Sequence, residues 1–193
     1  MNRILVMLLL TALSAYARPF YFGVKGGVPL ANSLKVADKA TYFSGKSPAV
    51  FGPAIELRLP LGLGAEAGLF YRRLEYGTAT SRTAGQVWEI PMLIKYSAPG
   101  VLVHPFIEAG LSARRLARFQ QRTDGTSTSD PPELEGRGSA GPTVGGGVEL
   151  RLPFAKLSAE IRYTRWGSSS FKSALGGLAT QLNQADFLLG IMF

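Results

Sequence analysis

The sequence predicts an all-β fold, an eight-stranded antiparallel up-and-down transmembrane β-barrel. Three observations indicate this fold: an N-terminal segment with the pattern of an export signal, eight segments in which apolar and polar residues alternate, and a last segment that ends on an aromatic residue. Within residues 186–193, Phe187, Leu189, Ile191 and Phe193 form one apolar face. Because the terminal strand of an outer-membrane barrel closes the wall, we expect Phe193 to act as a C-terminal assembly signal.

The chain is expected to divide into a cleaved signal peptide, residues 1–17, and an outer-membrane β-barrel, residues 18–193. Asn2 and Arg3 supply a short polar and positive start, residues 4–12 are almost entirely apolar, and Ala15-Tyr16-Ala17 has the small-residue pattern of a cleavage site. The apolar stretch is shorter than the ~20 residues that a membrane-spanning helix needs. No segment after it reaches that length either, so the rest of the chain would have to enter a membrane as strands.

Composition narrows the function classes. The chain has no cysteine, which excludes disulfides, thiol catalysis and cysteine-ligated zinc. Its formal net charge is +8. Such a basic balance can indicate nucleic-acid binding, but an exported protein meets little nucleic acid. We therefore expect no nucleic-acid partner, and we expect the charged partner to be outer-membrane lipid.

Alternation with a period of two residues extends over eight segments, and the helical period is confined to a turn or two. These segments are residues 20–29, 50–59, 63–74, 87–96, 102–116, 142–152, 156–166 and 184–193. Long connections (30–49, 75–86, 117–141 and 167–183) alternate with short ones (60–62, 97–101 and 153–155). An antiparallel meander therefore places all long loops at one rim and the short turns with both termini at the other, as in outer-membrane barrels.

One face of the alternating segments carries charge and the other carries almost none. In residues 156–166, for example, Glu160 and Arg162 alternate with Leu157, Ile161 and Tyr163. A soluble barrel would need the apolar face inside, so we predict polar side chains inside and apolar ones outside. The predicted lumenal polar network, a structural site, consists of Glu56, Arg58, Glu66, Arg72, Glu89, Lys95, Glu108, Arg114, Glu149, Arg151, Glu160 and Arg162, with His104 and Asp186 on the same face.

Because acids and bases in this set are nearly equal in number, we expect them to pair and to close the lumen, since unpaired charges in a narrow interior are costly. The alternative is that ions or protons pass through the lumen along these same charged residues. The outward aromatic residues are expected in two belts, near the loops and near the turns. Pro91 falls within a predicted strand, where it removes a ladder hydrogen bond, and a bulge is the expected accommodation.

Two segments repeat a short motif. Glu56-Leu57-Arg58-Leu59-Pro60 returns as Glu149-Leu150-Arg151-Leu152-Pro153, each preceded by a Gly-Pro pair. With residues 160–166 and the final Phe193, this pattern resembles the outer-membrane β-barrel domain family of PorT/OmpA-like small barrels, in particular an acidobacterial-type branch. The resemblance covers essentially residues 18–193. It implies an outer-membrane location and an eight-stranded barrel, and it transfers no catalytic or binding residues.

The sequence predicts neither an enzyme nor a cofactor. His104 follows a short turn and is expected to make a hydrogen bond inside the barrel rather than act as a general base. Ser168, Ser169 and Ser170 lie in a long connection without a histidine to activate them. Residues 145–147, three consecutive glycines, lack the following helix and Gly-Lys-Ser/Thr of a phosphate-binding loop. No spacing typical of a metal site is present.

Two functions of different classes follow. The first is an integral outer-membrane scaffold with a closed, salt-bridged lumen, inserted by the barrel-assembly machinery, with a surface ligand contacted through loops 30–49 and 117–141. The second is a small pore or transport barrel. A third, more distant alternative is a soluble periplasmic ligand-binding barrel with an apolar interior.

Overall fold

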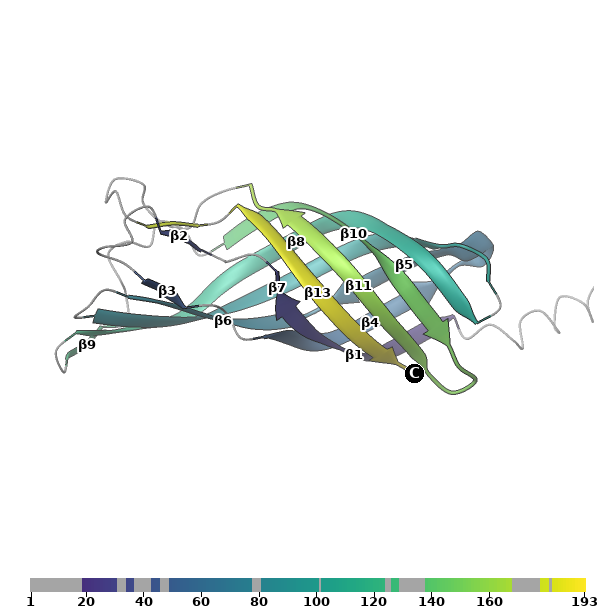
Figure 1. Cartoon of the computed structure of the whole chain (residues 1–193), viewed down its shortest axis with the longest axis horizontal. Coiled ribbons are helices and arrows are strands. Elements are labelled where there is room, and N and C mark those ends of the chain that lie inside the picture. The colour runs from purple at the N-terminus through teal and green to yellow at the C-terminus, as the bar shows by residue number, and fades with distance from the viewer. Residues whose placement is uncertain are drawn as a thin grey trace, which may run out of the picture.

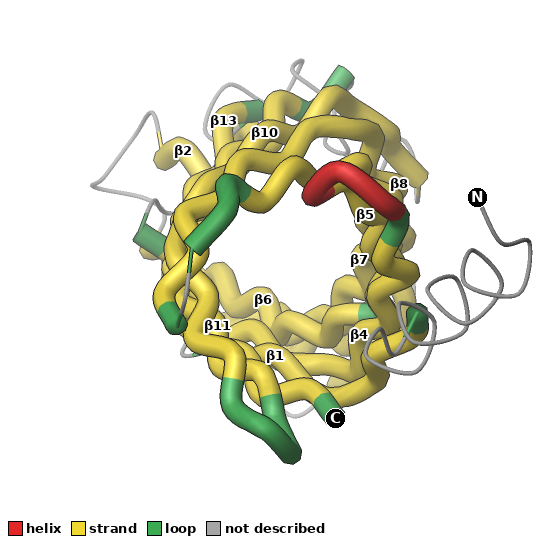
Figure 2. The backbone as a smooth tube through the Cα atoms, turned by 90° about the vertical axis from the view of Figure 1, so that its right-hand side faces the viewer, coloured by secondary structure: helices red, strands yellow, loops and turns green. Residues whose placement is uncertain are grey.

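The protein forms a closed, eight-stranded antiparallel β-barrel. The structure, a computed structural model, describes residues 19–30, 34–36, 43–45, 49–77, 81–100, 102–123, 126–128, 138–167, 178–180 and 182–193. The barrel wall consists of β1 (Phe20–Pro29), β4 (Val50–Arg58), β5 (Leu63–Gly68) continued by β6 (Phe70–Gly77), β7 (Ser81–Ser97), β8 (Val103–Thr123), β10 (Gly138–Arg151), β11 (Lys156–Arg165) and β13 (Asn183–Met192). Each wall strand pairs with its neighbour in sequence, and β13 returns to β1 to close the ring (Figure 2).

The seam between β1 and β13 is held at its end by Phe193. Phe22 N–H donates to the Phe193 carbonyl at 3.1 Å, and Phe193 N–H donates to the Phe22 carbonyl at 2.8 Å. The paired register continues from Gly23 opposite Met192 to Pro29 opposite Asp186. The last residue therefore contributes two of the hydrogen bonds that join the end of the wall to its beginning.

Short turns lie at one end of the barrel and longer connections at the other, as the sequence predicts (Figure 1). The 3-10 helix η1 (Pro60–Gly62) joins β4 to β5, and residues 152–155 join β10 to β11. At the loop end, the connections contain β2 (Leu34–Val36), β3 (Phe43–Gly45), β9 (Thr126–Thr128) and β12 (Leu178–Thr180). We call these two ends the turn end and the loop end.

Two predicted loop boundaries are wrong. The connection expected over residues 75–86 is mostly paired strand, because β6 and β7 remain in register to Gly77 opposite Arg82. The connection expected from residue 117 begins only after β8 ends, since Ser81 still pairs with Thr123. Strands β6, β7 and β8 thus extend at the loop end beyond the rest of the wall (Figure 1). These extensions are rich in polar residues, so their sequence does not alternate and does not predict strands.

The predicted strand over residues 63–74 is interrupted at Leu69 by prolines on both neighbouring strands. Leu69 N–H donates to the Pro53 carbonyl at 3.0 Å, and Pro53 has no N–H with which to return the bond. On the other side, the registers that flank the break place Gly68 opposite Pro91, which also lacks a donor. The two missing donors divide one wall strand into β5 and β6.

The bulge expected at Pro91 is wrong. Pro91 pairs with Ser112 in unbroken register between β7 and β8, and the irregularity in that pair lies between Ala84 and Gln86. Pro91 is buried, on the inner face. The neighbouring strand, rather than a bulge in β7, accommodates it.

Candidate functional site: the charged interior of the barrel

The interior of the barrel gathers the charged side chains. Those of Glu56, Glu66, Arg72, Glu89, Lys95, His104, Glu108, Arg114, Glu149, Glu160, Arg162 and Asp186 are buried. The side chains of Arg58 and Arg151, at the turn end, keep 22% and 26% of their surface exposed. Two further buried cations, Lys25 and Lys156, were missed. The alternation of the sequence could have predicted both as inward-facing, because Lys25 lies between Val24 and Gly26 and Lys156 has the same parity as Glu160.

The turn-end cluster joins the two copies of the repeated motif across the barrel. Its members are Glu56 and Arg58 of β4, Lys95 of β7, Glu149 and Arg151 of β10, and Lys156 of β11. Lys95 Nζ lies 3.0 Å from a carboxylate oxygen of Glu56 and 3.0 Å from one of Glu149. Lys156 pairs with Glu56 and lies 3.8 Å from Glu149. The two repeated glutamates therefore share two lysines, and the sequence repeat becomes one ionic cluster.

The central cluster lies in the middle of the barrel and contains Lys25, Glu66, Glu108, Glu160 and Arg162. Lys25 Nζ lies 2.6 Å from Glu66 and 2.7 Å from Glu160. The Arg162 guanidinium contacts three carboxylates, at 2.9 Å (Glu66), 3.0 Å (Glu108) and 2.7 Å (Glu160). Arg162 of β11 thus connects its own strand to β5 and β8. Its guanidinium therefore holds wall strands together as well as side chains of the interior.

Three carboxylates of the central cluster come close enough to hold a metal ion. One oxygen each of Glu66, Glu108 and Glu160 lies within 4.8 Å of the others, and oxygen ligands are those that hard cations prefer. The Lys25 ammonium and the Arg162 guanidinium, however, already lie at hydrogen-bond distance from these oxygens. The chain's own cations therefore supply the positive charge that a metal would bring.

The loop-end cluster contains Arg72, Glu89, Arg114, Gln184 and Asp186. Arg72 lies 3.2 Å from Glu89 and 2.7 Å from Asp186, and the Gln184 amide donates to the same two carboxylates at 3.1 and 2.9 Å. Arg114, instead of pairing with a carboxylate at this distance, stacks on the ring of Trp166. On the inner face of three adjacent strands, β8, β10 and β11, the hydroxyl groups of Ser112, Thr143 and Thr164 form a neutral chain with distances of 2.6 and 2.9 Å.

Aromatic side chains fill the space between the charges. Lys95 lies 3.8 Å from the ring centre of Phe106, Arg162 lies 5.6 Å from that of Phe70, and Arg114 lies 4.3 Å from that of Trp166. Tyr21 has Arg58 at 5.0 Å and Lys156 at 4.8 Å. Such contacts are worth more when the cation is desolvated. These rings were not among the predicted lumenal residues, although each has the parity of the charged face.

Little space remains between the central and loop-end clusters. A cavity bounded by Phe70, Arg162, Asp186 and Leu188 has a volume of about 10 Å³, which is about the smallest that holds one water. Val50, Phe70 and Leu188 form a small apolar core beside it. The open ring of backbone in Figure 2 is therefore filled at this level by side chains.

His104 and the glycine run have structural contacts. His104 Nδ1 lies 3.2 Å from the Ala98 carbonyl, in the turn that precedes β8. A side chain at Gly145 would lie 2.7 Å from a carboxylate oxygen of Glu108, so this glycine makes room for the central cluster. Ser168, Ser169 and Ser170 lie outside the described residues, as do the predicted signal peptide, most of loop 30–49 and residues 124–125 and 129–137 of loop 117–141.

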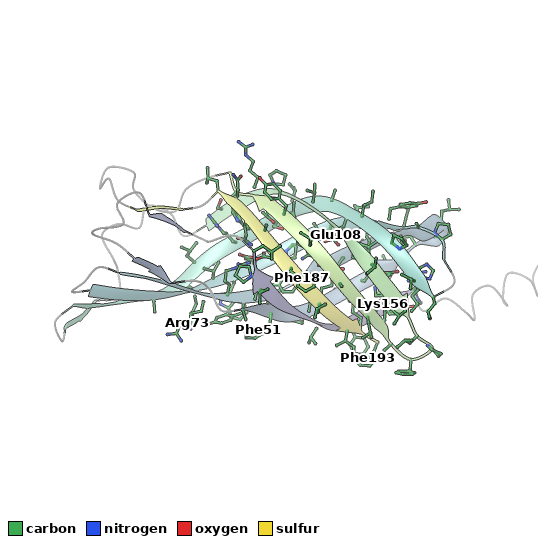
Figure 3. All side chains as sticks on the ribbon, viewed as in Figure 1. Phe51, Arg73, Glu108, Lys156, Phe187 and Phe193 are labelled. Carbon is green, nitrogen blue, oxygen red and sulfur yellow. The ribbon has the colours of Figure 1, made fainter. Side chains whose placement is uncertain are left out.

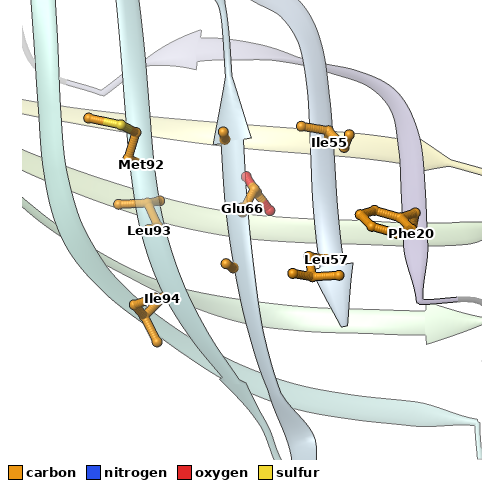
Figure 4. A pocket seen from close by; sticks show the side chains of 9 residues that line it. Phe20, Ile55, Leu57, Glu66, Met92, Leu93 and Ile94 are labelled. Atoms are coloured by element: carbon orange, nitrogen blue, oxygen red, sulfur yellow. The ribbon is translucent and has the colours of Figure 1, made fainter. Parts of the chain in front are cut away.

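The outer surface is apolar. Large hydrophobic side chains cover the outer wall, for example Phe22 (67% exposed), Ile107 (66%) and Phe51 (55%). Figure 3 shows Phe193 near the turn end and Phe51 nearer the loops. A shallow depression of about 350 Å³ follows β5, where Ala65 and Ala67 lie between the larger Ile55 and Ile94 (Figure 4). Glu66, between the two alanines, points away from it into the barrel. Among the described residues, no helix is long and apolar enough to cross a membrane.

Three solved structures are similar to this chain. Neisserial surface protein A has a TM-score of 0.54 at 18% identity, covering 90% of this chain and 96% of its own. The N-terminal β-barrel domain of Pseudomonas aeruginosa OprF has a TM-score of 0.45 at 16% identity, covering 91% of this chain and 98% of its own. Ail, the attachment invasion locus protein of Yersinia pestis, has a TM-score of 0.49 at 12% identity, covering 90% of this chain and 96% of its own.

No protein-family model and no curated protein matches the chain. The narrower resemblance to an acidobacterial-type branch therefore stays a prediction. At 18% identity, the likeness to Neisserial surface protein A is one of fold. The chain shares the closed, small, eight-stranded barrel with that protein.

Proposed function

We propose that this protein is an integral outer-membrane barrel with a closed lumen, a scaffold that holds its loops at the cell surface. The observation that carries the proposal is the inverted polarity: buried carboxylates and cations pair inside the barrel, while the outside is apolar along its length. In water such an exterior would expose far more contiguous apolar surface than a soluble protein tolerates. In a bilayer the same exterior is the surface that lipid covers.

Partners follow from this placement. Outer-membrane lipid surrounds the wall, and the barrel-assembly machinery is the proposed partner of the last strand with Phe193. Loops 30–49 and 117–141 are the proposed contact surface for a ligand outside the cell, because the loop end of such barrels faces outward. An export signal over residues 1–17 would bring the chain to this membrane.

A charge placed on the outer wall distinguishes a membrane barrel from a soluble one. Ile161 is exposed in the middle of β11, opposite Phe187. Changing Ile161 to Arg should destabilise the barrel refolded in lipid vesicles by about 2–4 kcal/mol, because an arginine there lies near the bilayer midplane. Asn183→Arg, at the rim of the neighbouring strand, is the control and should cost about 0–1 kcal/mol. Equal unfolding midpoints of the two variants in urea would contradict the proposed membrane wall.

Location and closure of the barrel are tested first by gel migration. The outer-membrane fraction is extracted with detergent and run with and without boiling. A membrane-fraction band whose migration changes on heating supports the proposal. A band in the soluble periplasmic fraction without such a change would contradict it and favour the ligand-binding alternative, in which an apolar compound co-purifies with the protein.

Conductance separates the scaffold from a pore. We expect purified barrel in a planar bilayer to show no steady openings, because Arg162 connects three carboxylates across the middle of the interior and eight strands leave room only for side chains. The double variant Arg162→Ala with Phe70→Ala, which removes side chains around the small cavity, is the comparison. Steady single-channel openings of the unaltered barrel would contradict a closed lumen and support the pore.

A further inference from the structure

Cations outnumber carboxylates at the turn end of the barrel. The turn-end cluster has two carboxylates, Glu56 and Glu149, and four cations, Arg58, Lys95, Arg151 and Lys156. The sequence around this end adds no acid, because neither Asp nor Glu occurs in residues 1–22, 59–62, 97–102 and 152–155. The central cluster, deeper in the barrel, has three carboxylates for two cations and so offsets one of the two surplus charges. The turn end therefore keeps a positive charge beyond what the described interior neutralises.

The arginines of the two repeated motifs meet at one carboxylate oxygen. Arg58 comes from β4 and Arg151 from β10, on opposite sides of the ring. Arg151 Nε donates to Glu149 Oε1 at 2.8 Å, and Arg58 Nη2 lies 3.5 Å from the same atom. The other oxygen of this carboxylate lies 3.0 Å from Lys95. Arg58 has one further polar contact, the Tyr21 hydroxyl at 3.4 Å. Both of its contacts are longer than the 2.7–2.9 Å typical of a charged hydrogen bond, so a single carboxylate leaves this guanidinium weakly held.

Water at the mouth of the barrel reaches both arginines. Figure 2 views the protein from this end, with η1 in red. The side chains of Arg58 and Arg151 are 22% and 26% exposed, whereas the two lysines of the same cluster are 2% and 1% exposed. Each arginine follows the buried glutamate of its motif by two residues, so its side chain leaves the wall on the inner face. The exposed part therefore faces the water of the mouth and not the lipid around the wall.

We propose that Arg58 and Arg151 bind the phosphate group of a soluble phosphate monoester at the turn-end mouth. That this mouth opens to the periplasm rests on the proposed function. Guanidinium groups match phosphate oxygens through paired N–H donors. A phosphate presents oxygens in several directions and accepts hydrogen bonds from two arginines that approach from opposite sides, whereas the two oxygens of a carboxylate lie in one plane. A phosphate monoester also carries about −1.5 to −2 charges at pH 7, which matches the surplus charge of the turn-end cluster.

The test follows the arginine Nε–Hε signals of the folded barrel by NMR, in a maltoside detergent that carries no phosphate. The probes are inorganic phosphate and glycerol 3-phosphate, with acetate as the comparison at equal ionic strength. We expect both phosphates to shift the Arg58 and Arg151 signals saturably, and acetate to bind at least about tenfold more weakly, because it carries a single charge and two oxygens. Arg58→Gln should weaken the binding of glycerol 3-phosphate about tenfold, as the loss of a hydrogen bond to a charged group does.

A second variant should act in the opposite direction. Glu149→Gln keeps the size of the side chain and removes the charge that competes with phosphate for both arginines, so the affinity for glycerol 3-phosphate should rise about tenfold. Arg165→Gln removes a positive charge from the exposed outer wall and is the control, with unchanged affinity. A heat-dependent gel shift is recorded on every variant to establish that the barrel is folded.

Three results would each overturn the inference: no saturable shift in the unaltered barrel, equal losses in Arg58→Gln and Arg165→Gln, or weaker binding by a folded Glu149→Gln barrel. Binding is measured on the isolated barrel, so its failure is separate from that of the proposed function. A heat-shifting membrane barrel that ignores phosphate refutes the phosphate site alone. A phosphate-binding protein found in the soluble periplasmic fraction refutes the proposed function and leaves the site in place.

Discussion

Arg162→Met is expected to give the largest loss of stability of any single change in the interior, about 3–5 kcal/mol. The variant leaves Glu66, Glu108 and Glu160 within 4.8 Å of one another with Lys25 as the remaining cation of the central cluster. Removing one partner of a buried ionic network is costly because the uncompensated charges stay buried. The measurement is the urea midpoint of the barrel refolded in detergent micelles, followed by the heat-dependent gel shift.

A second change tests the cause. Adding Glu108→Gln to Arg162→Met removes one of the crowded carboxylates and should recover part of the lost stability, as coupled neighbours do in a double-mutant cycle. Arg165→Met, three residues along the same strand but exposed on the outer wall, is the matched control and should leave the midpoint unchanged in lipid-free micelles. A midpoint of Arg162→Met equal to that of the Arg165→Met control would mean that the central cluster does not stabilise the barrel.

Phe193→Ser is expected to reduce strongly the amount of heat-shifting barrel in the outer membrane. Phe193 exchanges two backbone hydrogen bonds with Phe22 at the seam, and its half-exposed ring (44%) continues the apolar face of Leu189 and Ile191 on the outer wall. The substitution keeps the backbone groups and removes the ring, so it tests the aromatic side chain as the assembly signal. Membrane-fraction levels are compared by gel before and after heating.

His104→Ala serves as the control for this experiment. His104 contacts only a turn carbonyl in the described hydrogen bonds, and its loss should leave the membrane level of the barrel close to that of the unaltered protein. If Phe193→Ser and His104→Ala reached the membrane equally well, Phe193 would be an ordinary wall residue. Shortage of Phe193→Ser in the membrane together with normal refolding of the purified variant in detergent would place the defect in assembly rather than in stability.

The alternation of the sequence was sufficient for the inner and outer faces. Because successive side chains of a strand point to opposite sides, the parity of Glu160 and Arg162 assigns every other residue of β11, and Lys156 could have been assigned by the same rule. Strand ends were harder. The sequences of the β7 and β8 extensions do not alternate between apolar and polar residues, and only backbone pairing, such as Arg82 with Arg122 and Thr83 with Gln121, identifies them as strands.

The sequence by itself determined the class of fold, the direction of each side chain along the wall and the alternation of short and long connections, since all three depend on local periodicity. Only the tertiary structure decided which charges meet. Lys25 and Glu160 are 135 residues apart, and Arg162 and Glu66 are 96 apart, so their contacts depend on the register of every intervening strand.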